Sequence, residues 1–237
     1  MDWTERLAAP TGGGYTFSEG QRPYAICLLG PPASGKGTTA RLISSLWSLP
    51  IICPGDIYKE LREQDTELGR RVREALKDGG YCPNELTNQI MTEETQSRLA
   101  GGARGVLLDG FPRNAEQLGF LDSRYRVGMY LHLTSDYDTL LRAALGRREC
   151  PECHHISNEA LATARCDCDT SVMIRWDDTP KMYQKRWATY QRLTQPIIDA
   201  VSSRPNYVKM DVLRKRWGLD SMIDLWKPFI GQGCVEF

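Results

Sequence analysis

Residues 24–38 join an apolar run to a glycine-rich loop and an amphipathic stretch. The apolar run, Tyr24–Leu29, is uninterrupted, which is typical of a strand buried on both faces of a parallel sheet. The loop that follows reads Gly-Pro-Pro-Ala-Ser-Gly-Lys-Gly-Thr, and the stretch from about Lys36 to Leu46 predicts a helix. The order of strand, glycine-rich loop and helix predicts the opening unit of an α/β fold.

This loop has the composition of a phosphate-binding loop. Glycines let successive backbone N–H groups turn toward phosphate oxygens, and the helix N-terminus adds positive potential. The lysine would reach the β- and γ-phosphates of a nucleotide, and the threonine hydroxyl would face a magnesium ion. The alternative is a turn that binds nothing, and it is disfavoured because strand, loop, lysine and helix are all in register. The residues expected to contact the nucleotide are Gly30, Ala33, Ser34, Gly35, Lys36, Gly37 and Thr38.

Four more short apolar runs alternate with helical patterns along the chain. They occupy Pro50–Cys53, Gly105–Leu108, Val127–Leu133 and Tyr207–Met210. We therefore expect an α/β fold, a three-layer P-loop sandwich with a central parallel sheet. Residues 54–83 and 149–176 break the alternation and are interpreted as two small insertions. Residues 1–22 are expected to form a flexible leader, and residues 23–237 the folded unit.

Charge and hydropathy exclude several classes of function. Thirty basic residues balance thirty acidic ones, which gives no support for binding nucleic acid through a basic face. No apolar run is long enough to span a membrane, and the N-terminus lacks the features of a signal peptide. We expect a cytoplasmic protein, a monomer, with small-molecule partners.

Three motifs resemble those of one enzyme family. The Gly-Lys-Gly-Thr end of the loop resembles the phosphate loop of adenylate kinases and related nucleoside monophosphate kinases. The segment Leu107–Gln117, which reads LLDGFPRNAEQ, closely matches a second signature of these enzymes, and Arg175-Trp176-Asp177-Asp178 matches a third. The resemblance extends from about Tyr24 to Ile230. It implies an enzyme that transfers the γ-phosphoryl group of ATP, bound with Mg²⁺, to a nucleoside monophosphate. AMP is the first candidate acceptor, and UMP or CMP is the alternative.

The resemblance also implies roles for individual residues. Phosphoryl transfer needs aligned substrates and cations around the migrating group, and arginine suits this because its planar fork binds phosphate with two hydrogen bonds. Asp109 would order water around the magnesium, and Asp177 and Asp178 would pair with arginines of the lid (residues 149–176). The candidate catalytic residues are Lys36, Arg113, Arg147, Arg175 and Arg186. Arg147 would also bind ATP, and the expected acceptor site comprises Asp56, Lys59, Gly110, Arg113, Gln117, Arg175 and Arg186. Among these, Gln117 would read the acceptor base.

The second insertion carries a cysteine pattern typical of zinc. Cys150 and Cys153 form a C-x-x-C pair, and Cys166 begins a second, irregular pair. Two such pairs can make a tetrahedral zinc site, and a small polar lid needs a structural metal in place of an apolar core. The fourth ligand stays open between Cys168 and Asp169, with His154 and His155 as reserve ligands. A lid that keeps its cysteines without the metal is the alternative.

Departures from the family pattern fall where the bases would bind. Pro54 stands where a hydroxyl usually helps to seat the adenine of AMP, and Lys59 replaces an arginine. Ala143 occupies the place of an arginine that would stack on the ATP base. The retained arginines nevertheless favour an enzyme over the second hypothesis, a non-catalytic nucleotide-binding protein, because a binder has no need for cations around a migrating phosphoryl group.

Overall fold

The computed structural model describes residues 22–77, 82–152, 156–158, 168–175 and 178–211. Residues 1–21 of the expected leader lie outside this part of the chain. The strands are β1 (Tyr24–Leu29), β2 (Ile51–Ile52), β3 (Gly105–Asp109), β4 (Arg126–Thr134), β5 (Arg147–Glu149), β6 (Ile156–Asn158) and β7 (Tyr207–Asp211). The α-helices are α2 (Lys36–Trp47), α3 (Pro54–Glu63), α4 (Glu67–Ala75), α5 (Asn84–Ala100), α6 (Ala115–Arg124), α7 (Tyr137–Leu145), α8 (Pro180–Thr189) and α9 (Gln195–Val201). A π-helical turn, η2 (Tyr190–Thr194), joins α8 to α9.

Five strands form a parallel sheet in the order β2-β3-β1-β4-β7. Each coincides, within one or two residues, with an apolar run identified in the sequence, and the predicted α/β fold with a central parallel sheet is confirmed. Because the strands are parallel, their carboxyl ends meet at one edge, where α/β proteins bind their ligands. The phosphate loop after β1 and the Asp109–Gly110 turn after β3 are therefore neighbours at that edge.

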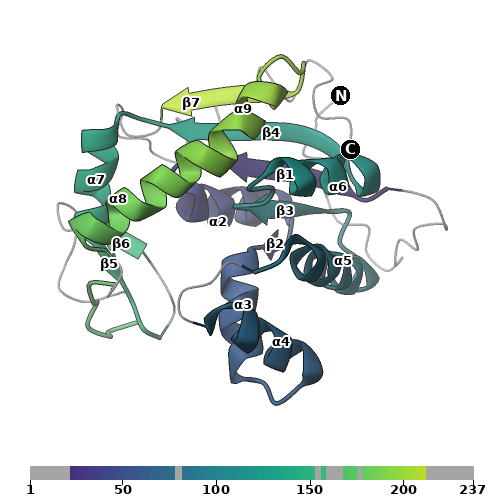
Figure 1. Cartoon of the computed structure of the whole chain (residues 1–237), viewed down its shortest axis with the longest axis horizontal. Helices are drawn as coiled ribbons and strands as arrows, with labels where there is room; N and C mark the ends of the chain where they lie inside the picture. Colours follow the sequence, from purple (N-terminus) through teal and green to yellow (C-terminus); the bar gives the residue numbers. More distant parts are fainter. Residues whose placement is uncertain (1–21, 78–81, 153–155, 159–167, 176–177, 212–237) are drawn as a thin grey trace.

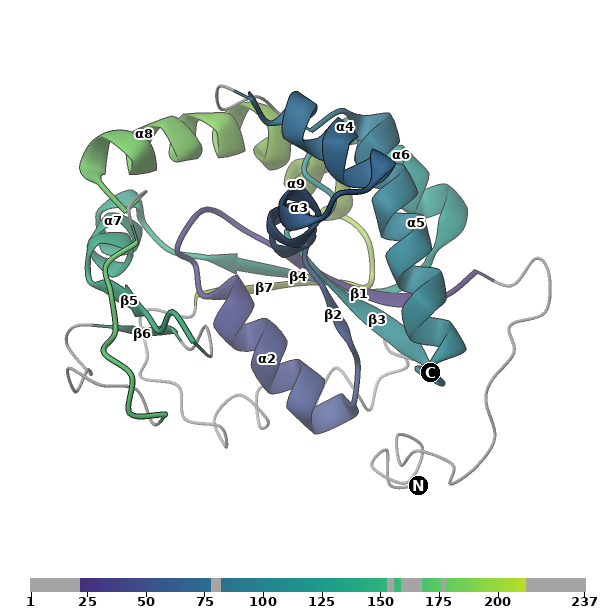
Figure 2. The ribbon, with the colours of Figure 1, turned by 90° about the horizontal axis from the view of Figure 1, so that it is seen from below.

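Helices cover both faces of this sheet (Figure 2). On one face α2 packs its buried residues, such as Ile43 and Trp47, against side chains of β1, β3, β4 and β7. On the other face α5, α6 and α9 contribute Met91, Leu121 and Ile197. Burial on both faces explains why the strands read as continuous apolar runs rather than as alternating ones.

Two small units stand away from the sheet (Figure 1). Helices α3 and α4 lie beyond the β2 edge, with a separate apolar cluster that includes Leu61, Val72 and Leu86. The antiparallel ribbon of β5 and β6 lies at the end of the molecule that carries α7 and α8. These units fall within, or at the border of, the two insertions expected from the sequence. None of the helices in the described ranges is long and apolar enough to cross a membrane.

Candidate active site

The phosphate loop is shaped by backbone that L side chains rarely adopt. Gly30 has a φ of 143°, and a Cβ there would lie 2.1 Å from the carbonyl oxygen of Leu133 in the neighbouring strand β4. Ala33 also lies in the left-handed region, with a φ of 62°. Its methyl group packs against the cluster that contains Leu140 and Tyr183. Strained backbone of this kind is concentrated at functional sites.

Lys36 is the first residue of α2, and its ammonium group turns back over the loop. It donates hydrogen bonds to the carbonyl oxygens of Gly30 at 2.9 Å and Pro31 at 2.7 Å. Burial lowers the pKa of Lys36 to about 8. The positive charges of Arg113 and Arg186 lower this pKa further, and the negative charge of Asp109 raises it. Ser34 is fully buried, whereas Thr38 is exposed on the first turn of α2. Among the described residues no salt bridge joins Lys36 to a carboxylate, so its ammonium group is suited to receive phosphate oxygens.

Asp109 ends β3 and faces this loop. A Cβ placed on Gly37 would lie 3.5 Å from Asp109 Oδ2, which puts the carboxylate beside the first turn of α2. Burial raises its pKa, and the charges of Lys36 and Arg113 oppose that rise. A carboxylate oxygen next to a phosphate loop fits the oxygen ligands that magnesium prefers.

Arg113 is held by the turn after β3. Its Nε donates to the carbonyl oxygen of Gly110 at 2.7 Å, and its backbone N–H donates to Gln117 Oε1 at 2.8 Å. Gly110 has a φ of 70°, and a Cβ there would lie 3.1 Å from Arg113 Nη2. The glycine thus lets the guanidinium lie directly over the backbone, while the side chain remains exposed.

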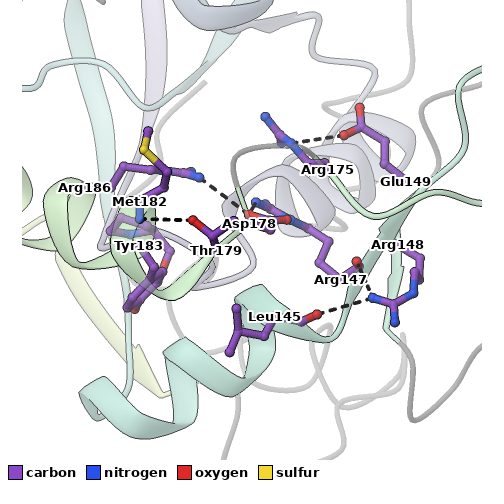
Figure 3. Close-up of polar contacts among 11 residues, drawn as sticks. Leu145, Arg147, Arg148, Glu149, Arg175, Asp178, Thr179, Met182, Tyr183 and Arg186 are labelled. Atoms are coloured by element: carbon purple, nitrogen blue, oxygen red, sulfur yellow. Dashed lines mark hydrogen bonds and ion pairs between the residues drawn. The ribbon is translucent and has the colours of Figure 1, made fainter.

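A buried carboxylate gathers two of the other predicted cations (Figure 3). Asp178, whose side chain is 1% exposed, accepts from Arg147 Nε at 2.7 Å and from Arg147 Nη2 at 2.5 Å. Arg186 Nη1 lies 3.6 Å from the same carboxylate. Arg175 Nε lies 3.3 Å from Glu149 Oε2. Asp178 pairs with Arg147, two residues before the lid, and Asp177 lies outside the described residues.

The acceptor-side helix α3 shows a different arrangement. Lys59 donates to Asp56 at 2.9 Å, and both side chains are largely exposed. Burial raises the pKa of Asp56, but the hydrogen bond and charge of Lys59, together with the charge of Arg175, hold it below its usual value. Gln117 is 2% exposed, and its Nε2 donates to Asn84 Oδ1 at 3.0 Å. Its carboxamide is thus engaged with the protein at both ends, a contact that the sequence alone did not indicate.

The metal site predicted in the lid is only partly described. Cys153 and Cys166 lie outside the described residues. Cys150 is buried, and its Sγ lies 3.5 Å from that of Cys168. Asp169 is exposed and adopts a φ of 62°. Within the described ranges no three metal-binding side chains gather together.

Comparison with known proteins decides the family. The adenylate kinase family model matches residues 28–205. The chain belongs to the adenylate kinase family. It is 32% identical over 216 residues to an adenylate kinase of Agathobacter rectalis, covering 87% of this chain and 97% of the relative. An adenylate kinase of Clostridium perfringens is 33% identical over 199 residues, 80% and 90% of the two chains. One of Anaeromyxobacter sp. strain K is 35% identical over 182 residues, 73% and 84% of the two chains.

Membership of this family defines the chemistry of the site. The protein is an ATP-dependent nucleoside monophosphate kinase, a phosphotransferase that uses ATP with Mg²⁺. The basic residues around Asp109 and Asp178 then have a chemical purpose, because charge on a migrating phosphoryl group must be neutralised while water is excluded.

Proposed function

We propose that this kinase transfers the γ-phosphoryl group of ATP to AMP and gives two molecules of ADP. The observation that carries the proposal is the convergence of cations at the sheet edge. The charges of Asp109, Arg113 and Arg186 all act on Lys36, and those of Lys36 and Arg113 act on the Asp109 carboxylate. The relatives described above are all named adenylate kinases, which favours AMP as the acceptor.

The donor side of the proposed site is built on the phosphate loop. Backbone N–H groups of residues 33–38 and the Lys36 ammonium would bind the β- and γ-phosphates. Asp109, by ordering water, and Thr38, through its hydroxyl, would hold Mg²⁺, and the ion would supply positive charge that stabilises the phosphates. Arg147 and Arg186 share the Asp178 carboxylate, which keeps both forks aligned toward one region before substrate binds.

The acceptor side is proposed to comprise α3, α4 and the turn at Gly110. Arg113 would bind the monophosphate with two hydrogen bonds, and the exposed guanidinium is consistent with this role. Arg175 acts electrostatically on Asp56, which links the lid side to the acceptor insertion. Residues 54–83 and 149–176 would thus serve as the acceptor-binding insertion and the lid.

The proposed site has fewer polar contacts for the acceptor base than for the phosphates. Pro54 offers no hydroxyl, and Lys59 is paired with Asp56. A missing polar contact to a base is worth about 1–3 kcal/mol. We therefore propose that AMP is used but discriminated less sharply than a complete set of contacts would allow, and UMP or CMP is the alternative acceptor.

A panel of acceptors tests this proposal. We expect AMP to have the highest kcat/KM among AMP, dAMP, CMP, UMP and GMP, with measurable turnover of dAMP or CMP. Pro54→Thr should lower the KM for AMP more than the KM for CMP. Higher kcat/KM for CMP or UMP than for AMP would establish the alternative, and exclusive use of AMP would show that Pro54 has no such effect.

We also propose that the lid holds a structural zinc ion. The 3.5 Å separation of the Cys150 and Cys168 sulfurs supports it, since two zinc-bound thiolates must lie close together. Cys153 and Cys166 would complete an all-thiolate set, or Asp169 would replace Cys168.

A further inference from the structure

A chain of hydrogen bonds runs from an exposed carboxylate to the backbone of Arg113. Glu116 Oε2 accepts from Asn84 Nδ2 at 2.6 Å. Asn84 Oδ1 accepts from Gln117 Nε2 at 3.0 Å and from Asn114 Nδ2 at 2.8 Å. Gln117 Oε1 then accepts from the backbone N–H of Arg113 at 2.8 Å. The chain therefore connects the first turns of α5 and α6, which pack against each other (Figures 1 and 2), to the turn that presents the arginine.

The two ends of this chain fix the orientation of everything between them. An ionised carboxylate only accepts hydrogen bonds, and a backbone N–H only donates them. Asn84 must therefore turn its NH₂ group toward Glu116 and its oxygen toward Gln117. Gln117 must in turn direct its NH₂ group toward Asn84 and its oxygen toward Arg113. Because Gln117 is 2% exposed, a reversed carboxamide would place its NH₂ group against the Arg113 N–H with no water to compensate.

The other anchors of Arg113 give this contact its importance. The Thr194 hydroxyl, at the end of η2, donates to the Arg113 carbonyl oxygen at 3.1 Å, and Arg113 Nε donates to Gly110. The backbone N–H is the third point of attachment, and Gln117 holds it. An error of about 1 Å in such a residue is enough to slow a reaction that depends on alignment.

We propose that Glu116 and Asn84 are positioning residues, which set the orientation of Gln117 and through it the backbone of the acceptor-phosphate arginine. This inference rests on the proposed function in one respect, the role of Arg113 at the acceptor phosphate. It also gives Gln117 a role besides the expected recognition of the acceptor base, because its Oε1 accepts a hydrogen bond from the backbone of Arg113.

Charge reversal at position 116 tests the proposal. In Glu116→Lys the new side chain only donates, so Asn84 can bond to it only by turning its oxygen away from Gln117 Nε2 and Asn114 Nδ2, which breaks the chain at Asn84. We expect the KM for AMP to rise about 10-fold, which corresponds to about 1.4 kcal/mol, with the KM for ATP unchanged within about twofold. Glu116→Gln can still accept a hydrogen bond from Asn84, so its KM for AMP should stay close to that of the parent enzyme.

Two further variants make the test specific. Glu85→Lys is the matched control, because Glu85 is an exposed glutamate in the first turn of α5, beside Asn84, and its reversal changes the charge equally. Adding Asn84→Asp to Glu116→Lys should restore the KM for AMP, since a carboxylate at position 84 accepts from both the lysine and Gln117. A general loss of folding would not be rescued in this way.

Hydrogen exchange at the Arg113 amide, followed by NMR, provides a readout besides activity. We expect faster exchange in Glu116→Lys and parent-like exchange in Glu116→Gln and in the rescued double variant. Parent-like exchange in Glu116→Lys, or equal effects in Glu85→Lys, would overturn the inference. If exchange follows the expected pattern but the parent enzyme phosphorylates no monophosphate, the proposed function fails and the orientation chain is supported.

Discussion

Replacing Asp178 with asparagine removes the negative charge that pairs with Arg147 and Arg186. The carboxylate is 1% exposed and receives two hydrogen bonds from Arg147, which is itself 13% exposed. Arg186 lies within 3.6 Å of the same group (Figure 3). Asparagine keeps nearly the same shape and one accepting oxygen, so the change isolates the negative charge and one of the two hydrogen bonds to Arg147.

The size of the effect follows from these contacts. A hydrogen bond between charged groups contributes about 1.5–3 kcal/mol, and breaking a fully buried ion pair costs about 3–5 kcal/mol. Solvent reaches Arg186, which is 33% exposed, so we expect a loss of about 2–3 kcal/mol in the free energy of unfolding. An unfolding entropy of about 2.1 cal/mol/K per residue over 237 residues gives about 0.5 kcal/mol/K, so Tm should fall by about 4–6 °C.

Thermal unfolding of both proteins without nucleotide measures this loss. Asp138→Asn is the control, because Asp138 is exposed on α7 and its variant should change the free energy of unfolding by less than about 0.5 kcal/mol. The kcat of Asp178→Asn should fall while its Kd for ATP does not increase, since a negative charge near the phosphates has been removed. An unchanged Tm, or a weaker affinity for ATP with unchanged kcat, would refute the reasoning.

Three further predictions concern the phosphates and the lid. The pKa of Lys36 is about 8 because the group is buried, and bound phosphate should raise it. ATP binding should therefore take up close to one proton at about pH 9, where the free lysine is mostly neutral, and almost none at about pH 7. Calorimetry in buffers of different ionisation enthalpy measures this proton uptake. Proton uptake that does not change with pH would contradict the prediction. Arg113→Lys should impair transfer nearly as much as Arg113→Ala, because a point charge cannot replace the fork; parent-like KM and kcat in the lysine variant would exclude the alignment role. Protein purified without chelator should carry about one zinc per chain, and removing it should lower Tm more than activity at room temperature; metal analysis that finds no zinc would rule out the lid site.

The sheet and the phosphate loop could be predicted from the sequence because their signals are local. The strands are buried on both faces, so each appears as a short apolar run, and β1 with its loop was located to the residue. The Lys59–Asp56 pair could also be predicted from the sequence, because residues three apart on a helix are neighbours.

The partners of the site residues could not be predicted in the same way. Arg147 and Asp178 are separated by 31 positions, and Gln117 and Asn84 by 33. Only the folded chain brings such residues together, and an asparagine at the start of a helix gives no sign of which distant carboxamide it will orient. The sequence thus predicted which charged residues belong to the candidate site, and the structure added what holds them in position.

Phosphorus NMR of a mixture of the enzyme, ATP, Mg²⁺ and AMP tests the central claim most directly. Transfer predicts that ATP and AMP disappear at equal rates while two molecules of ADP form for each AMP consumed. Lys36→Ala, which should fold normally, serves as the inactive control. ATP converted to ADP and inorganic phosphate with AMP untouched, or AMP phosphorylated at an unchanged rate by Lys36→Ala, would contradict the account.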